Sequence, residues 1–233
     1  MPMLTLTPAE LEALRLSLGI ALRSVLFSLP AAIAIAWLIA RGRGPIRFIL
    51  DACVHLPLVL PPVVVGYVLL LLFGVRGPIG AWLDAHFGVR LVFSSAGAAL
   101  ATAVMTFPLL VRAIRISLEG IDRGLEDAAC TLGAGPWDRF FSITLPLMVP
   151  GIVAGAVTAF AAGLGEFGAV ITFVSNVPGE TRTLPLALYT ALQSPDGDAL
   201  AARLASISFV LGLGGLLVSE FIARYVRRVL GRG

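Results

Sequence analysis

Lysine is absent from this chain, and all 17 basic residues are arginine. The absence excludes a Schiff-base lysine and a phosphate-binding loop that ends in Gly-Lys-Ser/Thr, because each needs a lysine ammonium group. Any nucleotide hydrolysis linked to this protein is therefore expected on another chain, together with the ATP and Mg²⁺ that it uses. We expect no cofactor in this chain.

Cysteine and histidine are scarce, with two of each among 233 residues. Cys53 and Cys130 fall in segments expected at or near the cytoplasmic face, where thiols stay reduced, so we expect no disulfide. His55 and His86 form no cluster at metal-ligand spacing, which argues against a metal site. Both histidines are interpreted as interfacial or loop residues.

Charged residues make up only 13% of the chain, whereas hydrophobic residues make up 58% and the mean hydropathy is +0.96. A soluble core of this size cannot hide so much apolar surface, so the composition indicates a membrane protein. The net charge of +3 is modest. We interpret it as an orientation signal and expect no nucleic-acid partner.

Long apolar segments occur at five places, and a spanning helix needs about 20 mostly apolar residues. The segments are about 17–40, 56–74, 94–111, 147–173 and 204–223. The sequence therefore predicts an all-α, polytopic membrane protein whose two ends lie on opposite sides. We divide it into an N-terminal periplasmic segment 1–12, a transmembrane domain 13–224 and a short basic cytoplasmic tail 225–233.

Arginine distribution predicts the orientation, because short cytoplasmic loops are enriched in basic residues. One side of the predicted topology holds eleven arginines and the other holds five. The eleven are Arg41, Arg43, Arg47, Arg112, Arg115, Arg123, Arg139, Arg224, Arg227, Arg228 and Arg232. The N-terminus is therefore predicted outside and the C-terminus inside.

Segment 1–12 lacks the basic start of a secretory signal, so we expect it to be retained. Within it, Thr7 is expected to cap a short surface helix that begins at Pro8.

The segment 174–203 is expected on the outer side. Its apolar run from Leu184 to Leu192 follows a turn cluster at 176–180 and is too short to cross a bilayer. We interpret this run as a re-entrant or interfacial helix. A sixth crossing is the alternative, but it would place Arg224 and the arginines after it outside.

A polar island separates two apolar segments. Asp127-Ala128-Ala129 is followed by three residues, Gly133, nine residues and then Ile143-Thr144-Leu145-Pro146. Gly133 is suited to the left-handed conformation that ends many helices, and Pro136 is suited to the first position of the next helix. The island therefore predicts a helix, a tight turn and a second helix.

This spacing resembles the signature of the membrane subunits of ABC-type importers: Glu-Ala-Ala, three residues, Gly, nine residues, Ile, any residue, Leu-Pro. Asp127 stands where that family usually has Glu, so the carboxylate is one methylene shorter. The resemblance implies the type I ABC importer permease fold and a cytoplasmic coupling helix within 125–146, which docks on an ATP-binding subunit and transmits its motion. The residues implied in coupling are Glu126, Asp127, Ala128, Ala129, Gly133, Ala134, Leu145 and Pro146. Glu126 and Asp127 are expected to meet basic residues of that subunit, and the salt bridge is assigned to neither of them alone.

A second stretch resembles one subgroup of that family. Gly165-Glu166-Phe167-Gly168-Ala169, the run 171–176 and the run 178–186 are similar to the molybdate importer permeases. Sulfate or thiosulfate permeases share the first of these runs and are the alternative, and tungstate is not separable from molybdate on sequence. The resemblance implies a bacterial inner-membrane homodimer that works with two ATP-binding subunits, a periplasmic oxyanion-binding protein and membrane lipid.

Two other classes are weighed against this transport subunit, which is not expected to be an enzyme. A proton-coupled anion carrier would use Glu166 as its proton site, but such carriers often contain internal repeats and none is evident. An intramembrane enzyme would need a zinc-binding His-Glu-x-x-His or a nucleophile and base pair, and neither is evident. Neither alternative class explains the polar island at 125–146.

Small or polar residues in the predicted spans are candidates for the translocation path or its gate. They are Ser94, Ser95, Gly165, Glu166 and Thr172. Helix packing is the alternative role for each. Charges inside a bilayer usually face a partner or water, and Arg23 and Glu166 are predicted at similar depth, so we hypothesise that they pair. The alternative is that both reach the outer interface separately.

Overall fold

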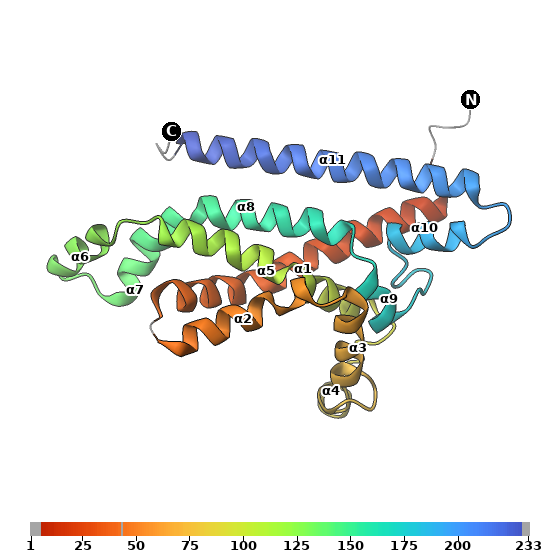
Figure 1. Ribbon diagram of the computed structural model, residues 1–233, viewed down its shortest axis with the longest axis horizontal. Coiled ribbons are helices and arrows are strands. Elements are labelled where there is room, and N and C mark those ends of the chain that lie inside the picture. Colours follow the sequence, from red (N-terminus) through yellow and green to blue (C-terminus); the bar gives the residue numbers. More distant parts are fainter. Residues whose placement is uncertain (1–5, 43, 230–233) are drawn as a thin grey trace.

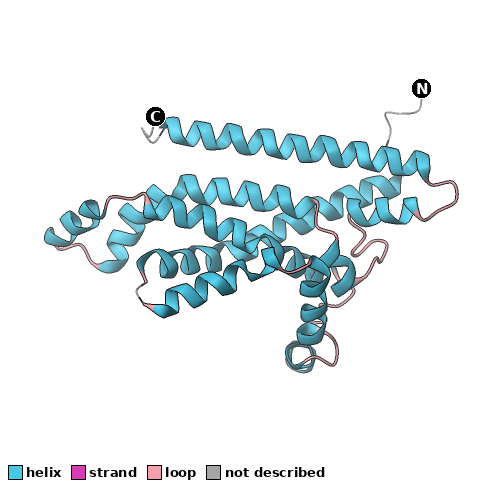
Figure 2. Cartoon of the chain, viewed as in Figure 1, coloured by secondary structure: helices cyan, strands magenta, loops and turns pink. Residues whose placement is uncertain are grey.

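The computed structural model describes residues 6–42 and 44–229, and all regular structure within them is helical (Figure 2). In chain order the elements are α1 (Pro8–Arg41), α2 (Pro45–Val59), α3 (Pro62–Phe73), α4 (Pro78–Phe87), α5 (Ser95–Glu119), α6 (Arg123–Thr131), α7 (Pro136–Arg139), the π-helix η1 (Phe140–Thr144), α8 (Leu145–Leu164), α9 (Gly168–Val174), α10 (Leu184–Leu192) and α11 (Asp198–Val229). The start of the expected segment 1–12, Arg43, Arg232 and the side chains of Arg227 and Arg228 lie outside the described part.

The core of the molecule is a set of long helices that run along its longest axis. α1 packs against α5, α5 packs against α8, and α11 lies along α8 (Figure 1). Buried Ile39, Leu110, Ile114 and Met148 belong to the cluster that joins α1, α5 and α8. α1 begins and α11 ends at opposite ends of this axis, as the predicted odd number of spans requires. Which end faces outward stays a prediction.

Small residues let α8 approach α5 closely. Gly151, Gly155, Ala159 and Gly163 recur at intervals of four and are all buried, which places them on one face of α8. A Cβ added at Gly151 would lie 2.3 Å from the Ser117 Cβ on α5. Close backbone contact through small residues is the usual way in which membrane helices associate.

The N-terminal cap is confirmed, but the expected short surface helix is not a separate element. Glu10 Oε2 accepts a hydrogen bond from the Thr7 backbone N–H at 2.7 Å, and the Thr7 hydroxyl accepts one from the Glu10 backbone N–H at 3.3 Å. Pro8 occupies the first turn. From there α1 continues without a break to Arg41, so the surface segment and the span expected at 17–40 are one helix of 34 residues.

The span expected at 56–74 is broken in the structure. α2 ends at Val59 and α3 begins at Pro62. The helix direction bends by 114° at this break. Pro61 and Pro62 explain the break, because proline lacks a backbone N–H and forces the residue before it out of the helical region. Four helices in the described residues are long and apolar enough to cross a membrane, or five if this bent pair counts as one.

The span expected at 147–173 is also divided. α8 ends at Leu164, with Gly165 as its C-cap, and the short α9 follows from Gly168. The expected segments 94–111 and 204–223 fall inside the longer α5 and α11. Periodicity alone did not reveal the division, because the residues on both sides of the break are apolar.

Between α9 and α11 the described chain contains no helix long enough to cross a membrane, as the interpretation of a re-entrant or interfacial helix expects, but residues 198–203 of the segment expected outside belong to α11. α10 has only nine residues. The loop before it is tied internally: the Thr181 hydroxyl donates to the Ser175 carbonyl at 2.9 Å, and the Arg182 guanidinium donates to the Asn176 side-chain oxygen at 3.0 Å.

Candidate functional site

The polar island projects at one end of the molecule (Figure 1): α6 is a separate short helix, and α7 is the first turn of a continuous helix that runs through η1 and α8 to Leu164. α6 ends in a Schellman motif, in which the Gly133 N–H donates to the Cys130 carbonyl and the Ala134 N–H donates to the Ala129 carbonyl, both at 3.0 Å. Gly133 adopts φ +87°, the left-handed conformation predicted for it. Pro136 begins α7, so the predicted helix, turn and helix are all confirmed.

The outer surface of this island is exposed and mixes apolar and acidic groups. Asp127 and Ala128 are exposed, and Ala129 and Ala134 are half-buried. Four large apolar side chains on the island are also exposed: Leu125 (49%), Leu132 (88%), Trp137 (75%) and Phe141 (57%). Such a cluster at the end of a molecule is typical of a surface that binds another protein.

Glu126, which the sequence grouped with Asp127, lies against the body of the protein. Its Oε1 atom accepts a hydrogen bond from Arg41 at the C-terminal end of α1, with an N to O distance of 2.7 Å. The same oxygen accepts a hydrogen bond from the Thr144 hydroxyl at 2.8 Å. The structure therefore separates the two acidic residues, with Asp127 facing outward and Glu126 paired within the chain.

The Leu-Pro end of the motif starts α8. Leu145 is half-buried, and Pro146, which has no backbone N–H to donate, follows at the second position of α8. The turn immediately before is the π-helix η1, in which the Leu145 N–H bonds to the carbonyl of Phe140. π-Helices are rare and are frequently found at functional sites.

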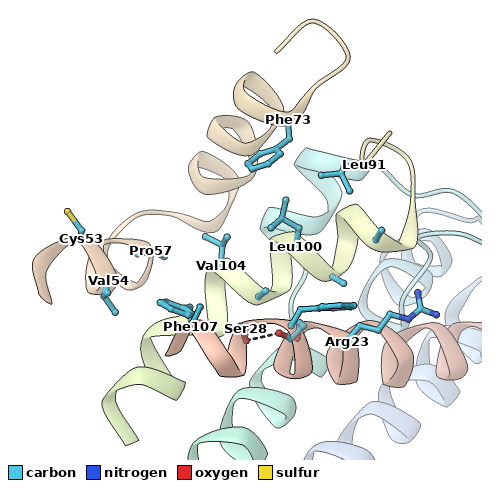
Figure 3. A pocket seen from close by; sticks show the side chains of 16 residues that line it. Arg23, Ser28, Cys53, Val54, Pro57, Phe73, Leu91, Leu100, Val104 and Phe107 are labelled. Atoms are coloured by element: carbon cyan, nitrogen blue, oxygen red, sulfur yellow. Dashed lines mark hydrogen bonds between the residues drawn. The ribbon is translucent and has the colours of Figure 1, made fainter. Parts of the chain in front are cut away.

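The candidate path residues Ser94 and Ser95 lie at the start of α5. Ser94 caps this helix: its hydroxyl accepts a hydrogen bond from the Gly97 N–H at 3.1 Å and donates to the Leu91 carbonyl at 2.7 Å. Ser95 accepts a hydrogen bond from the Arg23 guanidinium at 3.2 Å. Arg23 lies at one end of an apolar cavity of about 740 Å³ between α1, α2, α3 and α5 (Figure 3).

The other path candidates lie at the break between α8 and α9. Glu166 Oε1 accepts a hydrogen bond from the Ala169 backbone N–H at 2.9 Å, so this carboxylate satisfies the N-terminus of α9. Thr172 donates to the Gly168 carbonyl at 2.7 Å, and Gly165 ends α8. These contacts give each of the three residues a role in the structure of the break between α8 and α9.

The hypothesised pair of Arg23 and Glu166 does not form in this structure. Arg23 bonds to Ser95 and Glu166 bonds to the backbone of α9, and no ion pair joins Arg23 to Glu166 within the described ranges.

The two cysteines, Cys53 and Cys130, are free thiols. No group of three metal-ligating side chains occurs in the described part of the chain.

Sequence reasoning missed Arg41 and Thr144. Arg41 is 85 residues from Glu126 and was counted only as an orientation signal. Thr144 occupies the unspecified position of the Ile-x-Leu-Pro motif and gave no signal of its own. Its burial and its hydroxyl contact become visible only once η1 folds back toward α6.

Comparisons with known proteins agree with this geometry. Residues 28–230 match the family model of the binding-protein-dependent transport system inner membrane component. The chain is 58% identical to the molybdenum transport system permease protein ModB of Escherichia coli (strain K12), over 97% of this chain and 99% of that protein. It is 36% identical to the sulfate transport system permease protein CysT of the same organism, over 96% of this chain and 80% of that protein.

Solved structures with the same fold include a bacterial ABC transporter that imports the acidic polysaccharide alginate. The similarity has a TM-score of 0.73 at 20% identity and covers 95% of this chain and 81% of that chain. An alginate ABC transporter in complex with a periplasmic protein that holds an alginate pentasaccharide is similar with a TM-score of 0.71 at 20% identity, over 96% of this chain and 80% of that chain. At this identity the likeness shows the fold alone.

Proposed function

Because this chain belongs to the family of binding-protein-dependent transport system inner membrane components, we propose that it is the membrane-spanning subunit of an ATP-driven importer of molybdate. The similarity to molybdenum transport permeases over nearly the whole chain carries this proposal. The sulfate permease is less similar over the same span, which favours molybdate over sulfate. Tungstate, an oxyanion of the same shape and charge, is a second cargo of the same importer.

The chain itself provides the path and the mechanical connection, and the ATP-binding subunits provide the energy. The missing lysine excludes a phosphate-binding loop of the usual kind, so ATP and Mg²⁺ belong to a partner. The exposed island from Leu125 to Phe141 supports a docking role, because its apolar side chains would be covered by such a partner. Within it, Asp127 presents a carboxylate to basic residues of that subunit.

The proposed assembly is a homodimer of this chain in the bacterial inner membrane, with two ATP-binding subunits inside and an oxyanion-binding protein outside. Closed two-fold symmetry is the commonest arrangement of identical subunits. The exposed apolar side chains of α3 and α11, among them Tyr67, Leu71, Phe209 and Leu217, are available to the second copy or to lipid. Ser94, Ser95, Gly165, Glu166 and Thr172 remain proposed path or gate residues.

The test is uptake into liposomes that contain this chain with its ATP-binding subunits and the binding protein. We expect molybdate and tungstate to enter only when ATP is supplied on the side of the ATP-binding subunits, and we expect little sulfate to enter. A proton ionophore serves as the control for a proton-coupled carrier and should leave the initial rate unchanged. Preferred uptake of sulfate would contradict the substrate, and uptake that is indifferent to ATP would contradict the importer.

A further inference from the structure

We propose that Arg41, Glu126 and Thr144 form an intramolecular latch that fixes the coupling segment α6 to the end of α1 and to the start of α8. In this assignment, which rests on the proposed function, Glu126 is a positioning residue and is not a contact for the ATP-binding subunit. A single carboxylate oxygen accepts from both partners, at 2.7 Å from Arg41 and at 2.8 Å from Thr144. The latch thus joins α6 to α1, whose Arg41 is 85 residues from Glu126, and to η1, whose Thr144 is 18 residues from Glu126.

Burial makes this contact stronger than a surface ion pair. The side chains of Arg41 and Glu126 are only 15% and 22% exposed, and Thr144 is 3% exposed. Hydrogen bonds between charged groups are stronger than those between neutral groups, and an unpaired charge in a largely buried position is costly. Arg41 also lies in the last turn of α1, where the helix dipole favours a cation. An arginine of a partner would have to displace Arg41 from a favourable position.

Little else fixes the position of α6. Neither α6 nor α7 contains a buried residue. Its other polar contacts are local: Asp122 caps the helix at Gly124, and Thr131 bonds to the Ala128 carbonyl within the same helix. An element without buried side chains opens easily unless a specific contact holds it. The orientation of α6 toward the membrane helices therefore depends on the latch.

The latch also determines which helices sense a displacement of α6. Arg41 transmits it to α1, and Thr144 transmits it through η1 to α8. Since α1 and α8 both pack against α5, one movement of the coupling segment reaches the helix core at two places.

The experiment compares uptake with hydrolysis in the reconstituted complex. In Glu126→Gln, Arg41→Met and Thr144→Val we expect the number of oxyanions imported per ATP hydrolysed to fall, by about tenfold for the first two variants, while the ATP-binding subunits stay bound. The reversed pair Arg41→Glu with Glu126→Arg should recover a large part of this loss. Glu119→Gln is the matched control, because Glu119 also pairs with two arginines, Arg115 and Arg47, but its side chain is 41% exposed against 22% for Glu126, and the ratio should be unchanged.

Loss of ATP-binding subunits from Glu126→Gln, with a normal ratio in the complexes that remain, would overturn the latch and make Glu126 a docking residue. Failure of the reversed pair to recover any of the loss would overturn it as well. A second readout does not depend on transport: spin labels at exposed Leu38 on α1 and Leu132 after α6 should give a narrow distance distribution that broadens in Glu126→Gln. An unchanged distribution would contradict the latch even if the wild-type protein proved to carry another cargo.

Discussion

At the scale of single residues, neighbouring side chains in the proposed coupling region make different contacts. Asp127 points outward, and Glu126, one position earlier, is held by Arg41 and Thr144. Gly133 contributes through its backbone alone, because a left-handed residue closes the Schellman motif at the end of α6. The spacing of the motif therefore reflects a turn as much as a set of contacts.

Gly133→Ala tests the role of this turn. An added Cβ would meet nothing within 4 Å, so the cost arises from the left-handed backbone alone and is roughly 1–2 kcal/mol. We expect the Ala134 amide, which bonds to Ala129, to exchange with deuterium about fivefold to thirtyfold faster. Gly135→Ala is the control, because Gly135 has equal space but φ −67°, and equal exchange in both variants would contradict the explanation.

Residue-scale features were predictable where a local pattern reports them. Gly133 and Pro136 were assigned correctly because the conformations of glycine and proline are local properties. The partner of Glu126 was not predictable, because Arg41 is 85 residues away in the chain and only the folded arrangement places the end of α1 next to Glu126. The pair of Arg23 and Glu166 was inferred from similar depth, and depth does not determine where a side chain points.

At the scale of elements, α8 depends on its small residues for contact with α5. A Cβ at Gly151 would approach the Ser117 Cβ and, at 2.8 Å, the Ala113 carbonyl oxygen. At least one of these atoms belongs to backbone that cannot rotate away. The face of small residues therefore sets the separation of the two helices.

Gly151→Ala should consequently destabilise the protein by about 1–3 kcal/mol, the usual cost of overpacking. Gly212→Ala, in α11, is the control because nothing lies within 4 Å of its added Cβ, and it should cause no loss. The measurement is the thermal unfolding midpoint in detergent, followed by circular dichroism. Equal midpoints for the two variants would show that the contact between α5 and α8 adapts without cost.

The elements themselves were predicted better than their limits. Long apolar segments indicated the positions of α1, α5, α8 and α11, but not that the helix predicted to begin at Pro8 continues into the first span or that α8 ends at Leu164. The adjacent Pro61 and Pro62 did carry a signal for the break between α2 and α3. Hydropathy outweighed that signal, since the apolar run continues across both prolines.

At the scale of the whole molecule, α11 is connected to the first helix by a buried charge. Glu10 is 2% exposed, and its Oε2 atom accepts a hydrogen bond from Arg203 at 2.9 Å. These residues lie near opposite ends of the sequence and at the same end of the folded chain (Figure 1). The contact joins α1 and α11 at the end of the molecule opposite to α6 (Figure 1).

Arg203→Met should lower the free energy of unfolding by about 1–3 kcal/mol, because the buried carboxylate loses its charged partner. Adding Glu10→Gln to this variant removes the unpaired charge and should recover part of the loss. Arg15→Met, at an exposed arginine of α1, is the control. The thermal unfolding midpoint in detergent is measured for Arg203→Met, for the double variant and for Arg15→Met. A double variant no more stable than Arg203→Met would contradict this account.

The length of α1 has a mechanical consequence. Its 34 residues form a rod of about 51 Å, held near one end by Glu10 and Arg203 and at the other by Arg41 and Glu126. Because one continuous helix is held near both of its ends, a tilt at one end moves the other end directly, with no loop between them. Pro30 lacks the N–H that would bond to the Leu26 carbonyl, so the helix is expected to be least stiff at this position.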